Sequence, residues 1–272
     1  MSWQPSGRRV SAGRIWAWIV IGFLLLPVLV VIPLSFSNSR FLQFPPPGWS
    51  LRWYEELLNN DAWRSSLITS FEVAILASVI ATAAGLGASM YMLRCSPRAR
   101  SIVRVLVILP LVTPLIVIAV GQYEVLSRIH LIGFLPALAA SHALLGLPFA
   151  SLILFARLSK LNPYLERAAW TLGASRIRTF CRITVPLLAP AIGASLVTCF
   201  LVSFDEIVIA LFLSGPGNET LPVLTFSYLR SEVTPVVAAV STILIAATAL
   251  VVVLALLRAR IFNRPTQTRK AI

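Results

Sequence analysis

Three acidic residues interrupt long apolar stretches of this 272-residue chain: Glu72, Asp205 and Glu206. A carboxylate in a stretch that crosses a membrane is costly, so it usually faces a water-filled path or a partner. Aromatic residues stand close to these acids in the sequence, namely Phe71, Phe200 and Phe204. Carboxylates beside aromatic rings can hold an organic ammonium ion through charge pairing and cation–π contact. Structural pairing with Arg230 or with a partner subunit is the alternative.

The stretches around the acids predict an all-α polytopic membrane protein. Hydrophobic residues make up 58% of the chain and charged residues 12%, against about 25% charged in soluble domains. A hydrocarbon core of about 30 Å needs roughly 20 apolar helical residues, and continuous runs exclude the alternating strands of a barrel. The first run is longer than the core of a cleavable signal peptide. We expect one domain, residues 1–272, with six transmembrane helices within Ile15–Phe36, Ser66–Leu93, Val105–Tyr123, Leu131–Phe155, Leu187–Leu213 and Val233–Leu257.

The cationic residues predict the orientation of these helices, because cytoplasmic loops carry an excess of Lys and Arg. Eighteen of the 23 cationic residues fall on one side: Arg8, Arg9, Arg14, Arg94, Arg98, Arg100, Arg104, Arg157, Lys160, Arg167, Arg176, Arg178, Arg182, Arg258, Arg260, Arg264, Arg269 and Lys270. The other side has Arg40, Arg52, Arg64, Arg128 and Arg230. Both termini and the segment 157–186 are therefore expected in the cytoplasm. The predicted periplasmic loops are 37–64, with Trp49 and Trp53 as interfacial aromatics, and 214–232.

This orientation places Glu72 and the pair Asp205 and Glu206 in the outer half of the membrane, where they could meet one substrate. Adjacent residues on a helix project about 100° apart. One acid of the pair can therefore line a path while the other packs or forms an ion pair.

Residues for catalysis or cofactor binding are scarce in this sequence. It has no G-x-x-x-x-G-K-[ST] phosphate loop, so ATP hydrolysis must come from a partner. The two histidines are His130 and His142, and we interpret His142 as a hydrogen-bonding residue in helix packing. The three cysteines lack CxxC spacing and histidine partners, so we expect no disulfide, no metal site and no cofactor. The net charge of +13 comes from cations spread between apolar runs, which disfavours nucleic acid as a partner.

The long cytoplasmic segment 157–186 has helix signals of its own. Asn162 before Pro163 is typical of an N-cap and a first helical position, which predicts a helix over 164–172 that ends at Gly173. A second helical stretch is expected over 175–183, with Pro186 setting the entry to the next membrane helix. Two helices around a glycine turn would form a docking knob at the membrane face. An amphipathic helix resting on anionic lipid is the alternative.

The spacing in this segment resembles the EAA loop (E-A-A-x-x-x-G-x9-I-x-L-P) of permease subunits in binding-protein-dependent ABC importers. Arg167 occupies the glutamate position, with Glu166 one residue earlier, and Val185 occupies the leucine position. In that family the loop docks into a groove of the ATPase subunit. The resemblance implies ATPase coupling by Glu166, Arg167, Ala168, Ala169, Gly173, Ala174, Ile183 and Pro186.

Residues 200–230, with the S-F-D-E sequence and a G-P…T-L-P loop, resemble the spermidine/putrescine-type permease subunits, as does the stretch 44–54. The resemblance implies a type I ABC importer permease fold, polyamine uptake, and a substrate path lined by Glu72, Phe200, Phe204, Asp205 and Glu206. It also implies partners in the bacterial inner membrane: a homologous permease subunit in a heterodimer, two ATP-binding subunits and a periplasmic binding protein. The alternatives are an importer of an opine, amino-acid-like solute or other cation, a non-ABC channel or scaffold, and a membrane-embedded enzyme.

Overall fold

The computed structural model describes residues 7–231 and 234–262. Regular structure in these ranges is helical apart from one isolated bridge between Ser37 and Trp49. Glu232, Val233, Arg264, Arg269 and Lys270, which the sequence assigns to a loop, a span and a basic terminus, lie outside the described residues. The described chain forms two compact units. The terminal unit joins the segment up to Asn60 with the segment from Ser227, and the core unit is Asp61–Phe226.

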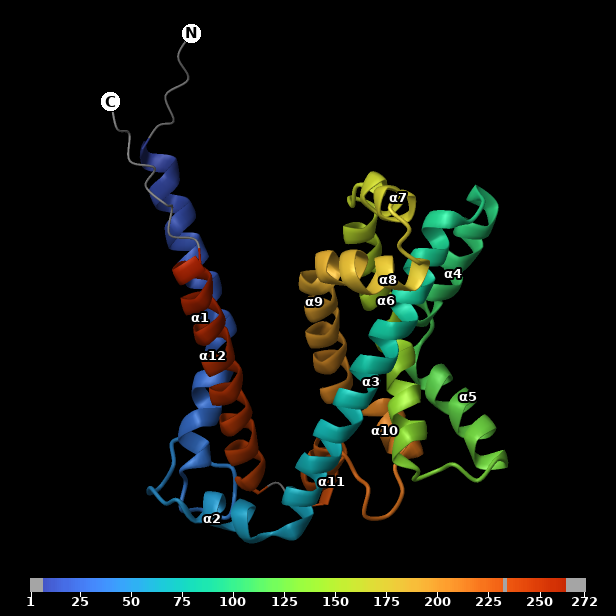
Figure 1. Ribbon diagram of the computed structural model, residues 1–272. Coiled ribbons are helices and arrows are strands. Elements are labelled where there is room, and N and C mark those ends of the chain that lie inside the picture. Colours follow the sequence, from blue (N-terminus) through green and yellow to red (C-terminus); the bar gives the residue numbers. More distant parts are fainter. Residues whose placement is uncertain (1–6, 232–233, 263–272) are drawn as a thin grey trace. The chain divides into compact units, whose positions relative to one another are not determined.

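The terminal unit contains two long helices that lie side by side, α1 (Gly7–Ser35) and α12 (Val236–Phe262), and the short α2 (Arg52–Asn59) (Figure 1). The loop after α1 folds back on itself, because the indole Nε1 of Trp53 donates to the Ser37 carbonyl at 2.7 Å. Trp53 is buried within the terminal unit and Trp49 is exposed, and their position at the membrane interface stays a prediction.

The core unit is built on three helices that pack against one another: α3 (Asp61–Arg94), α6 (Leu135–Leu158) and α9 (Val185–Phe204). Small residues recur every four positions on the buried side of α3, as Ala77, Ala81, Gly85 and Ser89. They face a similar row on α6, formed by Ala139, Ala143, Gly146 and Ala150. Small side chains let helix backbones approach closely, which is how helices pack where surrounding lipid is as apolar as leucine.

The third predicted span is not one straight helix. It divides into α4 (Pro97–Val112) and α5 (Leu115–Arg128), which meet at an angle of 102°. Pro114 causes the break, because the residue before a proline is disfavoured in the helical conformation. Thr113 accordingly is extended, with ψ 132°, and its hydroxyl donates to the Leu109 carbonyl at 2.9 Å.

The fifth predicted span is also interrupted. α9 ends at Phe204, and the short α10 (Val208–Leu213) follows after a break at residues 205–207. A further helix, α11 (Leu221–Ser231), lies in the segment predicted as the loop 214–232. The break falls at the charged pair Asp205 and Glu206, and α11 begins directly after the polar stretch 214–220.

Among the described residues, four helices are long and apolar enough to cross a membrane, and the bent α4–α5 pair makes a possible fifth. The apolar stretch Val236–Leu250 of α12 is shorter. The prediction of an all-α polytopic membrane protein is confirmed, and the count of six spans is consistent with these helices.

Two loops of the core unit meet through glycines. Gly133, with φ 78°, donates its N–H to the Leu213 carbonyl at 3.0 Å, and the side-chain amide of Asn218 donates to the Gly133 carbonyl at 2.9 Å. A Cβ on Gly215 would lie 2.8 Å from the Cα of Gly133. Side chains larger than hydrogen would therefore separate the loop after α5 from the loop after α10.

The α3–α6 contact predicts opposite effects for two glycines on α3. A Cβ on Gly85 would lie 2.7 Å from the Cβ of Ala150, whereas a Cβ on Gly87 would meet nothing within 4 Å. Gly85→Ala should destabilise the protein by about 1–3 kcal/mol through overpacking. Gly87→Ala should be neutral or stabilising by up to about 1 kcal/mol, because alanine favours helices over glycine. The stability of each variant is measured as the temperature at which half of the detergent-solubilised protein stays monodisperse. Equal temperatures for the two variants would contradict the close packing at Gly85.

Candidate functional site

The predicted docking knob is a helix that ends in a glycine turn. α7 (Pro163–Thr171) begins after Asn162, whose side-chain oxygen accepts the Tyr164 N–H at 3.0 Å. At the other end Gly173 has φ 85°. Its N–H and that of Ala174 bond to the carbonyls of Trp170 and Ala169, each at 3.0 Å, which is the Schellman pattern of helix termination. The predicted helix and its glycine end are both confirmed.

The second part of the knob differs from the prediction. α8 (Arg176–Thr179), capped by the Ser175 hydroxyl, continues through a π-helical turn, η1 (Phe180–Thr184), directly into α9. The Val185 N–H bonds to the Phe180 carbonyl five residues back. Pro186 has no N–H and so removes a bond of the first α9 turn, which is a common cause of a local change in helix geometry. The second part of the knob is therefore the start of the membrane helix α9, whereas α7 is a separate helix.

The residues of the EAA-like motif point in different directions. Arg167 is exposed, and its guanidinium lies 5.7 Å from the centre of the Tyr164 ring. Ala168 is exposed, and Ala169, Ala174 and Ile183 are half-buried. Glu166 instead faces the core unit: its carboxylate accepts the Thr184 hydroxyl at 2.6 Å and lies 3.6 Å from the guanidinium of Arg94. Arg94 and Thr184 were missed from the sequence, although Glu166 is the lone acid among the predicted cytoplasmic cations.

Two large apolar side chains are exposed at the tip of the knob, beside the exposed cations Arg176 and Arg178. Leu172 is 87% exposed and Ile177 is 78% exposed, one on each side of Gly173. α7 and α8 lie at the end of the core unit where α3 ends and α4 begins (Figure 1). Beneath α7 is a hollow of about 450 Å³, whose lining includes Arg94, Glu166, Trp170, Ile183 and Thr184. An apolar tip above a hollow is suited to contact a partner protein.

The predicted aromatic residues of the path form one cluster. The Phe71 ring on α3 lies 5.8 Å from that of Phe200 and 5.2 Å from that of Phe204 on α9. Phe200 and Phe204 stack at 5.5 Å. Glu72 and Asp205 follow Phe71 and Phe204 in the chain, and both are exposed. Two exposed acidic residues thus stand next in the chain to members of a cluster of three aromatic rings.

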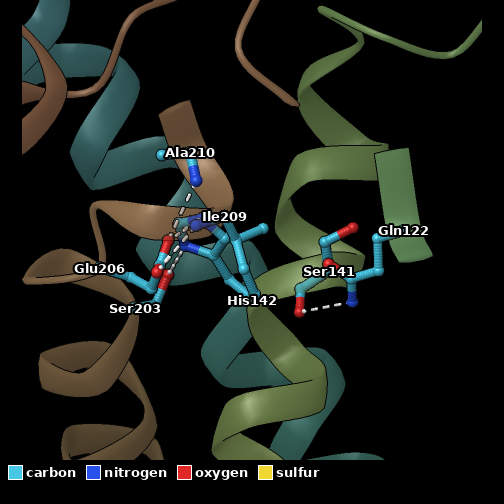
Figure 2. Close-up of polar contacts among 7 residues, drawn as sticks. All are labelled: Gln122, Ser141, His142, Ser203, Glu206, Ile209 and Ala210. Atoms are coloured by element: carbon cyan, nitrogen blue, oxygen red, sulfur yellow. Dashed lines mark hydrogen bonds and ion pairs between the residues drawn. The ribbon is translucent and has the colours of Figure 1, made fainter. Parts of the chain in front are cut away.

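Glu206 lies in a different environment from its neighbour, because it is buried. Its carboxylate accepts the backbone N–H groups of Ile209 at 2.9 Å and Ala210 at 3.0 Å, which supplies the missing partners at the start of α10 (Figure 2). One oxygen also lies 3.3 Å from Nε2 of His142 on α6. Nδ1 of His142 is 2.9 Å from the Ser203 hydroxyl.

These contacts confirm His142 as a hydrogen-bonding residue in helix packing. Its closeness to Glu206 was missed, because the two residues are far apart in sequence and the pairing depends on how α6 and α9 pack. Figure 2 also shows a separate contact on α6, where the Gln122 amide donates to the Ser141 carbonyl at 3.5 Å. Within the described residues, no group of three or more His, Cys, Asp or Glu is placed to hold a metal ion.

The fold is that of a polytopic membrane protein whose core unit is built on three packed helices, α3, α6 and α9. The structure is similar to a chain in the crystal structure of a bacterial alginate ABC transporter in complex with an alginate pentasaccharide-bound periplasmic protein. The TM-score is 0.67 at 19% identity, and the match covers 91% of this chain and 92% of the other.

Sequence comparison then gives the family. Residues 81–266 match the model described as the binding-protein-dependent transport system inner membrane component, and the chain belongs to this family of transport subunits. It is 31% identical to the spermidine/putrescine transport system permease protein PotC of Haemophilus influenzae, over 89% of this chain and 94% of that protein. It is 32% identical to the putrescine transport system permease protein PotI of Escherichia coli K12, over 84% of each chain.

The bonding of Glu206 predicts a structural effect that its neighbour does not share. In Glu206→Gln one of two acceptor oxygens is replaced by a donor group, so one backbone N–H of α10 loses its partner. We expect a loss of about 1.5–3 kcal/mol in stability, as for a hydrogen bond to a charged group. Asp205→Asn, which alters an exposed carboxylate, should change stability by less than about 0.5 kcal/mol. The thermal stability of the two solubilised variants is compared with that of the wild type. Wild-type stability of Glu206→Gln would show that Glu206 does not stabilise the break between α9 and α10.

Proposed function

We propose that this chain is a transmembrane permease subunit of an ATP-driven importer that takes up polyamines. The relatives named for spermidine and putrescine transport, at 31% and 32% identity over most of the chain, carry the substrate assignment. The cluster of aromatic rings, with an exposed acidic residue next in the chain to Phe71 and to Phe204, supports it independently, because organic ammonium ions bind to carboxylates and aromatic rings.

In the proposed path Glu72 and Asp205 attract the ammonium groups. Phe200 and Phe204 offer their ring faces to the cation and its methylene chain. Glu206 supports the path from behind, since its hydrogen bonds to α10 fix the break that carries Asp205. A path with charge at its edge and rings at its centre would favour cations over neutral solutes.

The proposed complex contains a homologous permease subunit in a heterodimer, two ATP-binding subunits and a periplasmic substrate-binding protein. The family description, which names dependence on a binding protein, supports the last of these. The exposed apolar tip of the knob, with Leu172 and Ile177, supports docking of an ATP-binding subunit. ATP would be hydrolysed by that partner rather than by this chain.

The proposed orientation has both termini and the segment 157–186 in the cytoplasm of a bacterium, with 37–64 and 214–232 on the periplasmic side of the inner membrane. The 18 to 5 distribution of cationic residues supports it. ATP binding would move the knob and open the path toward the binding protein, and hydrolysis would reverse the movement. The substrate path would thereby open to the two sides of the membrane in turn.

Docking at the knob predicts that transport depends on an empty surface at Gly173. Gly173→Asp should leave the protein in the membrane but prevent docking of the ATP-binding subunit, lowering uptake at least about tenfold, the equivalent of about 1.4 kcal/mol. Copurification of the ATP-binding subunit and uptake into proteoliposomes measure the two effects.

Gly217→Asp is the matched control for this experiment. Gly217 has φ 80°, against 85° for Gly173, and neither position has an atom within 4 Å of an added Cβ. The control therefore has the same backbone strain and space, but it lies in the loop assigned to the opposite side of the membrane. Normal copurification by Gly173→Asp would argue against the knob as docking site.

The proposed path predicts loss of polyamine uptake when an exposed carboxylate is neutralised. Asp205→Asn or Glu72→Gln keeps the shape but removes a charge, and a lost contact to an ammonium group of about 1.5–3 kcal/mol corresponds to about 10- to 150-fold weaker transport. The measurement is uptake of labelled spermidine or putrescine by proteoliposomes that contain the whole transporter.

Glu124→Gln serves as the control for loss of negative charge alone, because Glu124 is exposed and already paired with Arg128 at 2.6 Å. At least one path variant should be impaired while basal ATP hydrolysis is retained. If both transport normally, or if the wild type carries a neutral sugar and no polyamine, the substrate assignment is wrong.

A further inference from the structure

Helix α7 has no buried side chain, and polar contacts join it to the membrane helices. No residue of the described helix Pro163–Thr171 is buried, and a hollow of about 450 Å³ lies beneath it. Two cation–ring contacts of α7 lie within the knob, where Arg167 lies over Tyr164 and Arg176 over Trp170. A helix without a buried face has little hydrophobic contribution to hold it in place.

Glu166 is the residue of α7 that reaches out of the knob. One carboxylate oxygen accepts the Thr184 hydroxyl at 2.6 Å, and the other lies 3.6 Å from the Arg94 guanidinium at the end of α3. The Thr184 side is protected from water, because Thr184 is 2% exposed. The Arg94 side is more open and so contributes less. One carboxylate thereby connects α7 with two long helices of the core unit.

Thr184 occupies a sensitive position, as the last residue of the π-helical turn η1 before α9 begins. π-helical turns are rare and occur mostly as single turns at functional sites. A displacement of Thr184 would move the chain at this irregular turn. The helix that follows, α9, ends at the break that carries Asp205. Movement of α7 can therefore reach the proposed substrate path along one helix.

We propose that Glu166 and Thr184 form the mechanical link that passes movement of the coupling knob into α9, with Arg94 as a secondary contact. Glu166 is then a positioning residue that faces inward, in contrast to the exposed Arg167 beside it. This inference rests on the proposed function, since it concerns how docking of the ATP-binding subunit alters the path.

The test uses the complete transporter in proteoliposomes and measures both polyamine-stimulated ATP hydrolysis and polyamine molecules taken up per ATP. Thr184→Val removes the hydroxyl but keeps the shape. It should leave the complex assembled and its basal hydrolysis normal, while both coupling measures fall about fivefold or more, the lower end of usual coupling between sites. Thr184→Ser, which restores the hydroxyl, should recover coupling to within about twofold.

Thr198→Val is the matched control on the same helix, because the Thr198 hydroxyl donates only to the Ala194 carbonyl of its own helix, at 2.9 Å. This variant should couple as the wild type does. Glu166→Ala combined with Thr184→Val should be no worse than Glu166→Ala alone, because both changes remove one shared interaction. If Thr184→Val fails to fold, Glu166→Ala alone, which leaves Thr184 in place, provides the measurement of coupling.

Normal coupling by Thr184→Val, additive losses in the double variant, or release of the ATP-binding subunit by Thr184→Val would each overturn the link. Failure of the proposed function looks different, because it appears in the wild type. A wild-type complex that binds no ATP-binding subunit, or that is not stimulated by any polyamine, would overturn the proposed function and the link with it.

Discussion

Inside a bilayer every backbone N–H and C=O must find a partner within the protein, because there is no water to provide one. A continuous helix meets this requirement by itself, but an interrupted helix does not. The core unit contains two interrupted spans, and a side chain bonds to the backbone beside each interruption. Thr113 donates to the Leu109 carbonyl beside the α4–α5 bend, and Glu206 accepts two N–H groups at the start of α10.

This requirement explains why adjacent acids can serve different purposes. The break after α9 exposes one of them, Asp205, and turns the other, Glu206, toward the free N–H groups of α10. Without such a carboxylate the break would leave unpaired donors in the membrane, and without the break Asp205 would remain on a regular helix. The exposed charge therefore depends on the buried one.

Local sequence signals predicted the parts of the structure that local interactions determine. Asn162, Pro163 and Gly173 specify the two ends of α7, because capping involves residues within one helical turn, and the helix was predicted correctly. Hydropathy likewise located the apolar segments. It could not locate the bends, since a run of apolar residues has the same hydropathy whether its backbone is straight or broken, as Val105–Tyr123 illustrates.

The contacts that the sequence did not reveal are those between distant segments. Glu206 meets His142, and Glu166 meets Thr184 and Arg94, only after the helices have packed. Small residues at 81, 85 and 146 allow this packing, but their spacing alone does not specify which helices pair or in which register. The acids were recognised as unusual from sequence, whereas their partners required the structure.

The turn at the tip of the knob is held together by main-chain bonds from Gly173 and Ala174, not by the side chains around it. Its shape is therefore independent of which residues it displays at positions 172 and 177. A lineage can exchange these residues to follow changes in a neighbouring subunit without having to redesign the backbone that presents them. Such a turn keeps its backbone shape while its surface residues change. Subunits of related transporters can therefore differ in which partner they bind and still share one architecture.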